Sequence, residues 1–331
     1  MPLVKVQSRG TENVGGGRKN LIINGAMEVA QRGTSASSKT ASDYYTCDRW
    51  RTEASGATFN TSQQSNTASD MATTGAKHFL RMEVTTANNN SGISQKIETK
   101  NIRQFKGEKL TLSFYAKGTN PNGGSFDVVR QFDDGSASST QEKSSLTVTS
   151  SFVKYTYTFD YPDEGSVTMT DANAKMALSF LQPDGDTSTN AWTLDITAVQ
   201  LEVGSQATPF EHRSFGEELA LCQRYYYRRV TDTSSQYLCD AFTTSSTQIV
   251  GLVQFPVEMR AAPTQAGEDL EDAVFRHDGG TNAFDSFSGI AGVPSKSGTA
   301  AFITTSGLSA NKSGFIRHHD GAVGLNFDAE L

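Results

Sequence analysis

The feature that most constrains the fold is a long stretch in which apolar and polar residues alternate, from Trp192 to Val203. The apolar positions are Trp192, Leu194, Ile196, Val199, Leu201 and Val203. Gly204 ends the pattern, and a short tail follows to Pro209-Phe210-Glu211. Alternation with a period of two is typical of a β-strand that buries one face. The stretch therefore predicts a strand at the centre of a sheet-based fold.

Other stretches before residue 211 alternate in the same way. They are residues 21–23, 44–51, 78–84, 109–117, 125–132, 152–159 and 176–181. The segment Gly118 to Gly124, rich in Gly, Asn and Pro, is a strong turn signal between two of them. Because no amphipathic helix separates these strands, we predict a jelly roll or β-sandwich over residues 21–211.

The remainder of the chain completes an all-β prediction with two domains. Ser214 and Glu217 have the spacing of a helix capping box, so we expect a linking helix within residues 212–229. Short alternating stretches resume from residue 230 to 331 and predict a second, small β-domain. Residues 1–20 are polar, basic and contain Gly15-Gly16-Gly17, which predicts a flexible arm that becomes ordered on a partner.

Composition excludes several classes of function. The 331-residue chain has a net charge of −7 and no Lys/Arg-rich block, which argues against nucleic-acid binding. No stretch approaches the ~20 apolar residues of a membrane span, so we expect no membrane insertion. Cys47, Cys222 and Cys239 lack the spacing of a zinc site and are predicted to be free thiols, with a disulfide between Cys222 and Cys239 as the alternative.

Catalytic motifs are also missing from the sequence. It contains no nucleophile elbow, no HExxH and no Gly-rich phosphate loop. Two carboxylate pairs, Asp133-Asp134 and Asp163-Glu164, each lie beside Gly or Pro, where acidic residues serve turns and solubility. A glycosidase needs two carboxylates on opposite sides of a sugar cleft, and nothing in the pattern indicates such a pair. We therefore predict that the protein is not an enzyme.

Four segments together carry a resemblance to a known class of protein. Asn20 to Glu28 (NLIINGAME) resembles the opening strand, and Trp192 to Glu211 the closing strand, of a carbohydrate-binding-module-like jelly roll. Phe215 to Tyr227 and Phe255 to Thr264 resemble the joining helix and C-terminal β-module of phage tail-fibre proteins. The combination resembles bacteriophage virion structural proteins. It implies a non-enzymatic tail fibre or fibre-like appendage for host attachment, with capsid decoration protein and polysaccharide depolymerase as alternatives.

The resemblance also implies a structural calcium ion. Sugar-binding jelly rolls commonly hold Ca²⁺ near their first and last strands, where this chain has Glu28 and Asp195. Hard oxygen ligands from two strands suit Ca²⁺. The family usually carries two adjacent aspartates at the second position, whereas Asp195 is followed here by Ile196. The alternative is that both carboxylates are edge residues engaged in hydrogen bonds.

Aromatic residues provide the candidate sugar-binding surface. Tyr155 and Tyr157 lie on the same side of their predicted strand and could form a platform on which a sugar ring stacks. The alternative is that both pack in the core. Trp50 and Trp192 lie in alternating apolar patterns, which favours core packing over ligand binding.

The last candidate site is a subunit interface. It comprises Tyr225, Tyr226, Tyr227, Arg228 and Arg229. Tyr and Arg are enriched at contacts between chains, although ordinary packing between domains is the alternative. With the resemblance, we expect a homotrimer in the virion that binds other virion proteins through residues 1–20 and a host-surface polysaccharide.

Overall fold

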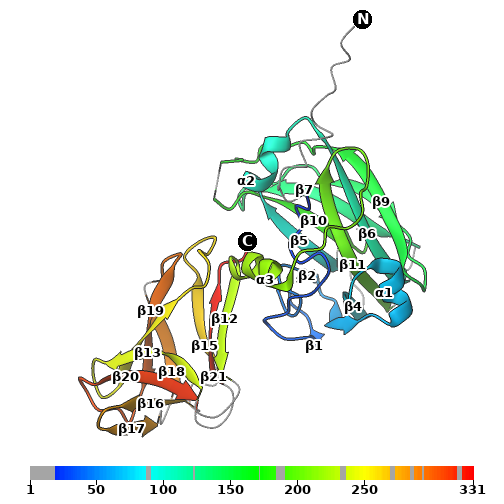
Figure 1. Ribbon diagram of the computed structural model, residues 1–331. Helices are drawn as coiled ribbons and strands as arrows, with labels where there is room; N and C mark the ends of the chain where they lie inside the picture. The colour runs from blue at the N-terminus through cyan, green and yellow to red at the C-terminus, as the bar shows by residue number, and fades with distance from the viewer. Residues whose placement is uncertain are drawn as a thin grey trace, which may run out of the picture. The chain divides into compact units, whose positions relative to one another are not determined.

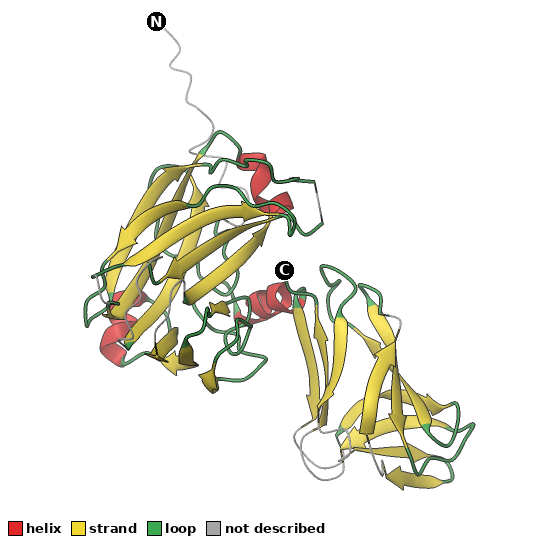
Figure 2. Cartoon of the chain, turned by 180° about the vertical axis from the view of Figure 1, so that it is seen from behind, coloured by secondary structure: helices red, strands yellow, loops and turns green. Residues whose placement is uncertain are grey.

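The computed structural model describes residues 19–331 apart from 87–90, 122–123, 171, 184–190, 232–235, 269–272, 284–286, 293 and 319–322. The described residues form two compact units, residues 19–214 with Leu331, and Phe215–Glu330. Strands dominate both units and helices are few and short (Figure 2). The predicted all-β class is confirmed. Residues 1–18 of the predicted arm lie outside the described residues.

Two antiparallel sheets make up the first unit (Figure 1). The six-stranded sheet has the order β1 (Ser35–Lys39), β3 (Thr58–Ser65), β4 (His78–Thr86), β11 (Trp192–Val203), β6 (Lys109–Thr119), β9 (Val153–Asp160). The five-stranded sheet has the order β2 (Arg51–Glu53), β5 (Gly92–Glu98), β10 (Lys175–Leu181), β7 (Phe126–Asp133), β8 (Glu142–Leu146). Short helical segments α1 (Ala68–Thr74), α2 (Thr99–Ile102) and η3 (Arg103–Phe105) lie between strands.

The alternating apolar residues of both sheets share one core. Phe114 of β6 packs edge-on against Phe180 of β10, with ring centroids 4.8 Å apart, so the two sheets contact each other directly. Trp50 and Trp192 are both 1% exposed within this core, as their patterns predict. Their indole N–H groups donate to Asn24 O and Gln182 Oε1, each over 3.0 Å. Two layers over one apolar interior define a β-sandwich.

The opening segment, residues 20–29, binds strand β11 at a bulge. The pairing of β11 with β6 shifts register between Thr197 and Gln200, and Ala198 has a positive φ of 49°. Val199 N–H turns away from the ladder and donates to Gly25 O over 2.9 Å. A Cβ on Gly25 would lie 2.2 Å from Val199 O, so only glycine fits. The two segments that resemble the opening and closing strands are thus in direct contact.

Hydrogen bonds of Asn20 and Glu211 stabilise the same contact between the opening segment and β11, called the junction below. The Asn20 side chain accepts from Ile22 N (2.9 Å) and Leu201 N (3.1 Å) and donates to Val199 O (3.1 Å). The Glu211 carboxylate in turn accepts from Asn20 N over 2.9 Å. Asn20, placed in the arm by sequence analysis, is therefore part of the sandwich.

The second unit begins with α3 (Phe215–Gln223) and contains two antiparallel sheets. The three-stranded sheet has the order β12 (Tyr226–Thr231), β21 (Val323–Asp328), β15 (Thr264–Glu268). The seven-stranded sheet has the order β17 (Gly280–Ala283), β16 (Ala273–His277), β20 (Ser313–His318), β13 (Tyr237–Thr243), β14 (Gln248–Gln254), β19 (Gly298–Thr305), β18 (Phe287–Gly292). No described helix is long and apolar enough to span a membrane.

The helix is shorter than the predicted linker. It ends at Gln223, and residues from Tyr226 onward form β12 because their backbone pairs with β21 along its whole length. The three cysteines are buried free thiols, as predicted. Burial raises the pKa of Cys239 to about 12, so this thiol stays protonated at neutral pH.

Candidate functional site

The predicted calcium residue Asp195 has a different partner. It lies on β11 opposite Arg81 of β4, and its two oxygens accept from Arg81 Nε (2.8 Å) and Nη2 (2.7 Å). The Asp195 side chain is only 2% exposed; burial raises its pKa, and the guanidinium opposes that shift. Glu28 is half-buried in the opening segment. Across the described residues, no group of three or more His, Cys, Asp and Glu could hold a metal ion. The pair Glu28 and Asp195 thus stays a prediction without a donor set around it.

The predicted sugar platform, Tyr155 and Tyr157, faces the interior of the sandwich. Both rings stack on the fully buried Phe114, at centroid distances of 5.7 and 6.1 Å. Their hydroxyls donate to Thr147 O (2.7 Å) and Ser145 O (2.8 Å), which lie on or just beyond β8. The two side chains share one side of β9, as predicted, but they close the edge between the two sheets. One face of each ring is used for packing, and both side chains remain partly exposed, so the platform stays a prediction.

The tyrosines of the predicted interface pack within the second unit. Tyr225, Tyr226 and Tyr227 are 1%, 7% and 8% exposed. Tyr227 stacks on Phe327 with ring centroids 6.0 Å apart and belongs to the core of this unit. Arg228 and Arg229 remain half-buried. Burial of the rings within one chain removes them from a contact between chains, so of this set only the arginines remain at the surface.

The carboxylate pairs have local structural roles. Asp134 accepts from the backbone N–H groups of Ser136 (2.8 Å), Ala137 (2.7 Å) and Thr168 (2.7 Å). These hydrogen bonds lower the pKa of Asp134 to about 2. Glu164 forms an ion pair with Lys106 over 2.6 Å. The pairs therefore stabilise turns, as the sequence indicates.

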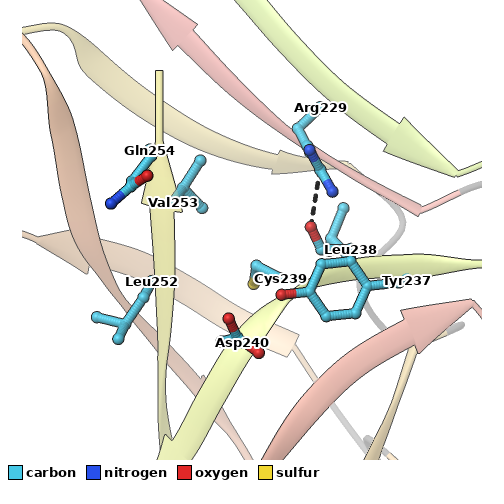
Figure 3. A pocket seen from close by; sticks show the side chains of 8 residues that line it. All are labelled: Arg229, Tyr237, Leu238, Cys239, Asp240, Leu252, Val253 and Gln254. Atoms are coloured by element: carbon cyan, nitrogen blue, oxygen red, sulfur yellow. Dashed lines mark hydrogen bonds between the residues drawn. The ribbon is translucent and has the colours of Figure 1, made fainter. Parts of the chain in front are cut away.

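A surface pocket in the second unit is the best candidate site. It has a volume of about 320 Å³ and lies over β13, β14 and the adjacent part of β12 (Figure 3). Its lining residues are Arg229, Tyr237, Leu238, Cys239, Asp240, Leu252, Val253 and Gln254. Polar and apolar groups both line the pocket, and the polar surface is the larger of the two.

Strand register explains which side chains reach the surface. β13 contains a bulge between Tyr237 and Cys239, so Leu238 and Cys239 are both buried while Tyr237 and Asp240 both face outward. Asp240 pairs with Leu252 of β14. Tyr237 is 44% exposed and Leu252 50% exposed. The outer face thus places an aromatic ring, a carboxylate and an aliphatic side chain together.

Polar groups surround the Tyr237 ring. The Arg229 guanidinium carbon lies 5.8 Å from the ring centroid, and Arg229 Nε donates to Leu238 O over 2.8 Å (Figure 3). Burial and the neighbouring Asp240 carboxylate raise the pKa of the Tyr237 hydroxyl. The amide of Gln254 lines the opposite side of the pocket. Hydrogen-bonding groups on both sides of an exposed ring suit a polar ligand with an apolar face.

The pocket continues into a second depression of about 580 Å³. Leu252, Val253 and Gln254 line both depressions, so the two are adjacent, and together they are called the groove below. The second part adds Phe255 and a segment that begins at Ser297.

No protein-family model and no curated protein matches the sequence. Solved structures similar in fold include the enzymatically active domain of bacteriophage CBA120 tailspike protein 4, at 13% identity and TM-score 0.36 over 56% of this chain and 21% of that chain. A family 11 carbohydrate-binding module of Clostridium thermocellum matches at 14% identity and TM-score 0.32, over 51% and 96%. A xylan-binding domain of Paenibacillus barcinonensis matches at 12% identity and TM-score 0.33, over 47% and 92%. The matched part is about a fifth of the tailspike domain, and these similarities concern the fold alone.

The sequence predicts short strands between residues 230 and 331 but does not predict the pocket. The segment Tyr237 to Phe242 is apolar in both alternation phases, and so is Gln248 to Phe255. Apolar residues in both phases place some of them on the outer face, where Tyr237, Phe242 and Leu252 are 44%, 40% and 50% exposed. That double pattern was the available signal. Periodicity does not reveal the bulge that turns Tyr237 and Asp240 to the same side.

Proposed function

We propose that the protein is a non-enzymatic bacteriophage virion structural protein, a tail fibre or fibre-like appendage that attaches to a polysaccharide of the host surface. The four segments that resemble phage structural proteins support the virion role, and two of these segments join at the β11 bulge. In this proposal, the first unit is a structural sandwich and the second unit carries the binding surface.

The observation that carries the binding role is the exposed Tyr237 ring at one end of the groove. Sugars present apolar ring faces that stack on aromatic side chains, and their hydroxyls bond to neighbouring polar groups. Tyr237 supplies the ring face, Asp240 supplies an acceptor on the same face of β13, and Gln254 supplies donor and acceptor groups on the other side of the pocket (Figure 3). Leu252 continues the apolar floor into the second depression.

We also propose that the chain assembles as a homotrimer and that residues 1–18 attach it to other virion proteins. Deletion should spare Lys19 and Asn20, because both bond to Glu211 at the edge of the sandwich. A variant lacking residues 2–18 is expected to fold and trimerise but to be absent from particles. Light scattering measures the oligomer, and immunoblots of purified virions measure incorporation. Normal incorporation of the truncated chain would refute the anchor.

Binding is tested by comparing Tyr237→Ala with Phe242→Ala. Both residues are exposed aromatics on the same face of β13, but only Tyr237 lines the groove. Removal of the stacking ring is expected to weaken binding to purified host-surface polysaccharide by about tenfold or more, from the ~1.5–3 kcal/mol that burial of a large apolar side chain contributes. Equal affinities for the two variants would refute the site.

Two further measurements separate the alternatives. Antibody labelling of intact virions is expected to mark the tail, and labelling spread over the capsid would favour the decoration protein. Incubation with the polysaccharide is expected to release no reducing ends. Measurable turnover would favour a depolymerase.

A further inference from the structure

We infer that Thr208 and Gln200 of the first unit become joined by an intramolecular ester cross-link. In this reaction the Thr208 hydroxyl displaces ammonia from the side-chain amide of Gln200. The cross-link is a modification of the sandwich itself and goes beyond the proposed function. It is carried by a cluster of polar groups at the end of β11, where a hydroxyl, a carboxylate and an amide contact one another.

Strand β11 and the tail that follows it enclose the amide and the carboxylate. Gln200 and Glu202 lie two residues apart after the bulge of β11, so both side chains point to the face opposite the core. They are nevertheless buried, at 0% and 3% exposed. The tail bonds to both of them, because Thr208 N donates to Glu202 Oε1 over 2.9 Å and Glu211 N donates to Gln200 Oε1 over 2.8 Å. The two reactive groups are thus held in fixed positions away from bulk water.

The Glu202 carboxylate contacts both the nucleophile and the leaving group. Thr208 Oγ1 donates to Glu202 Oε2 over 2.7 Å, and Gln200 Nε2 donates to Glu202 Oε1 over 2.9 Å. Thr208 Oγ1 lies 3.3 Å from Gln200 Nε2, the nitrogen bonded to the carbon that is attacked. A carboxylate in this position takes the hydroxyl proton as a general base and delivers it to the departing nitrogen as a general acid.

Two further groups stabilise the charges that develop during the reaction. Glu211 N–H donates to Gln200 Oε1, the oxygen that becomes negative when the attacked carbon is tetrahedral. Lys19 Nζ donates to Thr208 Oγ1 over 2.6 Å and to Pro209 O over 2.7 Å, which places a positive charge beside the oxygen that loses its proton. A hydroxyl oxygen has two lone pairs, so the bond from Lys19 leaves one of them for the attack.

The reaction balances without any other reactant. A bond forms between Thr208 Oγ1 and Gln200 Cδ, and the hydroxyl proton passes to Glu202. The bond between Gln200 Cδ and Nε2 then breaks, and the nitrogen takes the proton from Glu202 and leaves as ammonia. Glu202 returns to its starting carboxylate. Dilution of ammonia into the solvent favours the product, and burial of Gln200 protects the ester from hydrolysis.

Mass spectrometry of the full chain after unfolding and trypsin digestion tests the cross-link. Trypsin is expected to release residues 176–213 as one peptide, because cleavage after Lys175 and Arg213 bounds a stretch without other Lys or Arg. That peptide is expected to be lighter than its sequence by one ammonia and to give no fragments from cleavage between Gln200 and Thr208. A peptide of full sequence mass, or normal fragmentation between the two residues, would overturn the inference. A peptide joined to the one that contains Lys19 would also overturn it, because the lysine would then be the nucleophile.

Variants test the assigned roles by the same measurement. Thr208→Val removes the hydroxyl and Glu202→Gln removes the proton acceptor, so the peptide from each is expected at its full sequence mass. Thr208→Ser keeps a hydroxyl and is expected to form the ester. Thr111→Val is the matched control, because the buried Thr111 hydroxyl donates to Gly204 O over 2.7 Å outside the reacting groups, and it is expected to leave the cross-link intact. Ammonia loss that persists in Thr208→Val would refute the role of the hydroxyl. Tryptophan fluorescence confirms that the first unit of each variant is folded.

Hydroxylamine distinguishes an ester from an amide, because it cleaves esters far more readily. Treatment of the isolated peptide is expected to open the link and to raise its mass by one hydroxylamine. Resistance to hydroxylamine would contradict the ester. The measured quantity is mass and not binding, so the inference and the proposed function stand or fail separately.

Discussion

The junction at Asn20 can be tested by removing one side chain. Asn20 is 4% exposed and forms three hydrogen bonds, to Ile22 N, Leu201 N and Val199 O. Asn20→Ala leaves these three buried backbone groups without that partner, at about 1 kcal/mol each for the lost bonds alone. We therefore expect the free energy of unfolding of the first unit to fall by about 3 kcal/mol or more. For a unit of this size, that corresponds to a decrease in Tm of about 6–12 °C.

Tryptophan fluorescence is the suitable assay for this variant. The protein has two tryptophans, Trp50 and Trp192, and both lie in the core of the first unit. Fluorescence during thermal or urea unfolding therefore follows this unit without interference from the second. Asn60→Ala is the matched control, because Asn60 also forms side-chain hydrogen bonds, to Ser38 N and Glu83, but at exposed positions. If Asn20→Ala lowers Tm no more than Asn60→Ala does, the junction does not hold the sandwich together.

Three more substitutions test the first unit by the same fluorescence assay. The pKa of Asp134 in the fold is about 2, below the ~3.9 of an unfolded aspartate, so its contribution to stability is present above pH ~4 and is lost toward pH 2. The difference in unfolding free energy between wild type and Asp134→Asn should therefore shrink as the pH falls from about 4 to about 2. A constant difference would contradict this prediction. Tyr157→Phe removes the hydrogen bond to Ser145 O and should cost about 1 kcal/mol without changing polysaccharide affinity, whereas a loss of binding would support the platform at Tyr155 and Tyr157. Arg81→Met leaves the buried Asp195 carboxylate without its bidentate partner and should cost about 1–3 kcal/mol, and a smaller loss in the presence of Ca²⁺ than in chelator would support a cation at Asp195.

Much of the fold can be predicted from the sequence because alternating apolar and polar residues indicate β-strands. The stretch from Trp192 to Val203 forms the predicted strand, and its apolar side chains point into the core. The end of α3 could not be predicted. The helical spacing of apolar residues continues past Gln223 through Tyr226, but the residues from Tyr226 onward pair with β21 and form strand β12 instead. Contacts with strands a hundred residues away decide such boundaries, and a local pattern does not contain them.

The candidate sites were harder to predict because alternation tells which residues share a face but does not tell what covers it. Tyr155 and Tyr157 share one face of β9, yet β9 is the edge strand of its sheet, and their rings fill the gap toward β8. Asp195 is likewise fixed by register, which places it opposite Arg81. In both cases a polar or aromatic residue that suggested a ligand is satisfied by a neighbouring strand.

Tyr237 differs from these residues for a physical reason. β13 lies inside its sheet, so its backbone is paired on both sides and its outward side chains have no neighbouring strand edge to close. The bulge then brings Tyr237 and Asp240 to the same outer face, and the exposed ring keeps its surface available. Exposed apolar area is costly in water unless a ligand or partner covers it. An aromatic residue on the outer face of an interior strand is therefore a stronger indication of a binding surface than an aromatic residue on an edge strand, where packing between sheets already accounts for it.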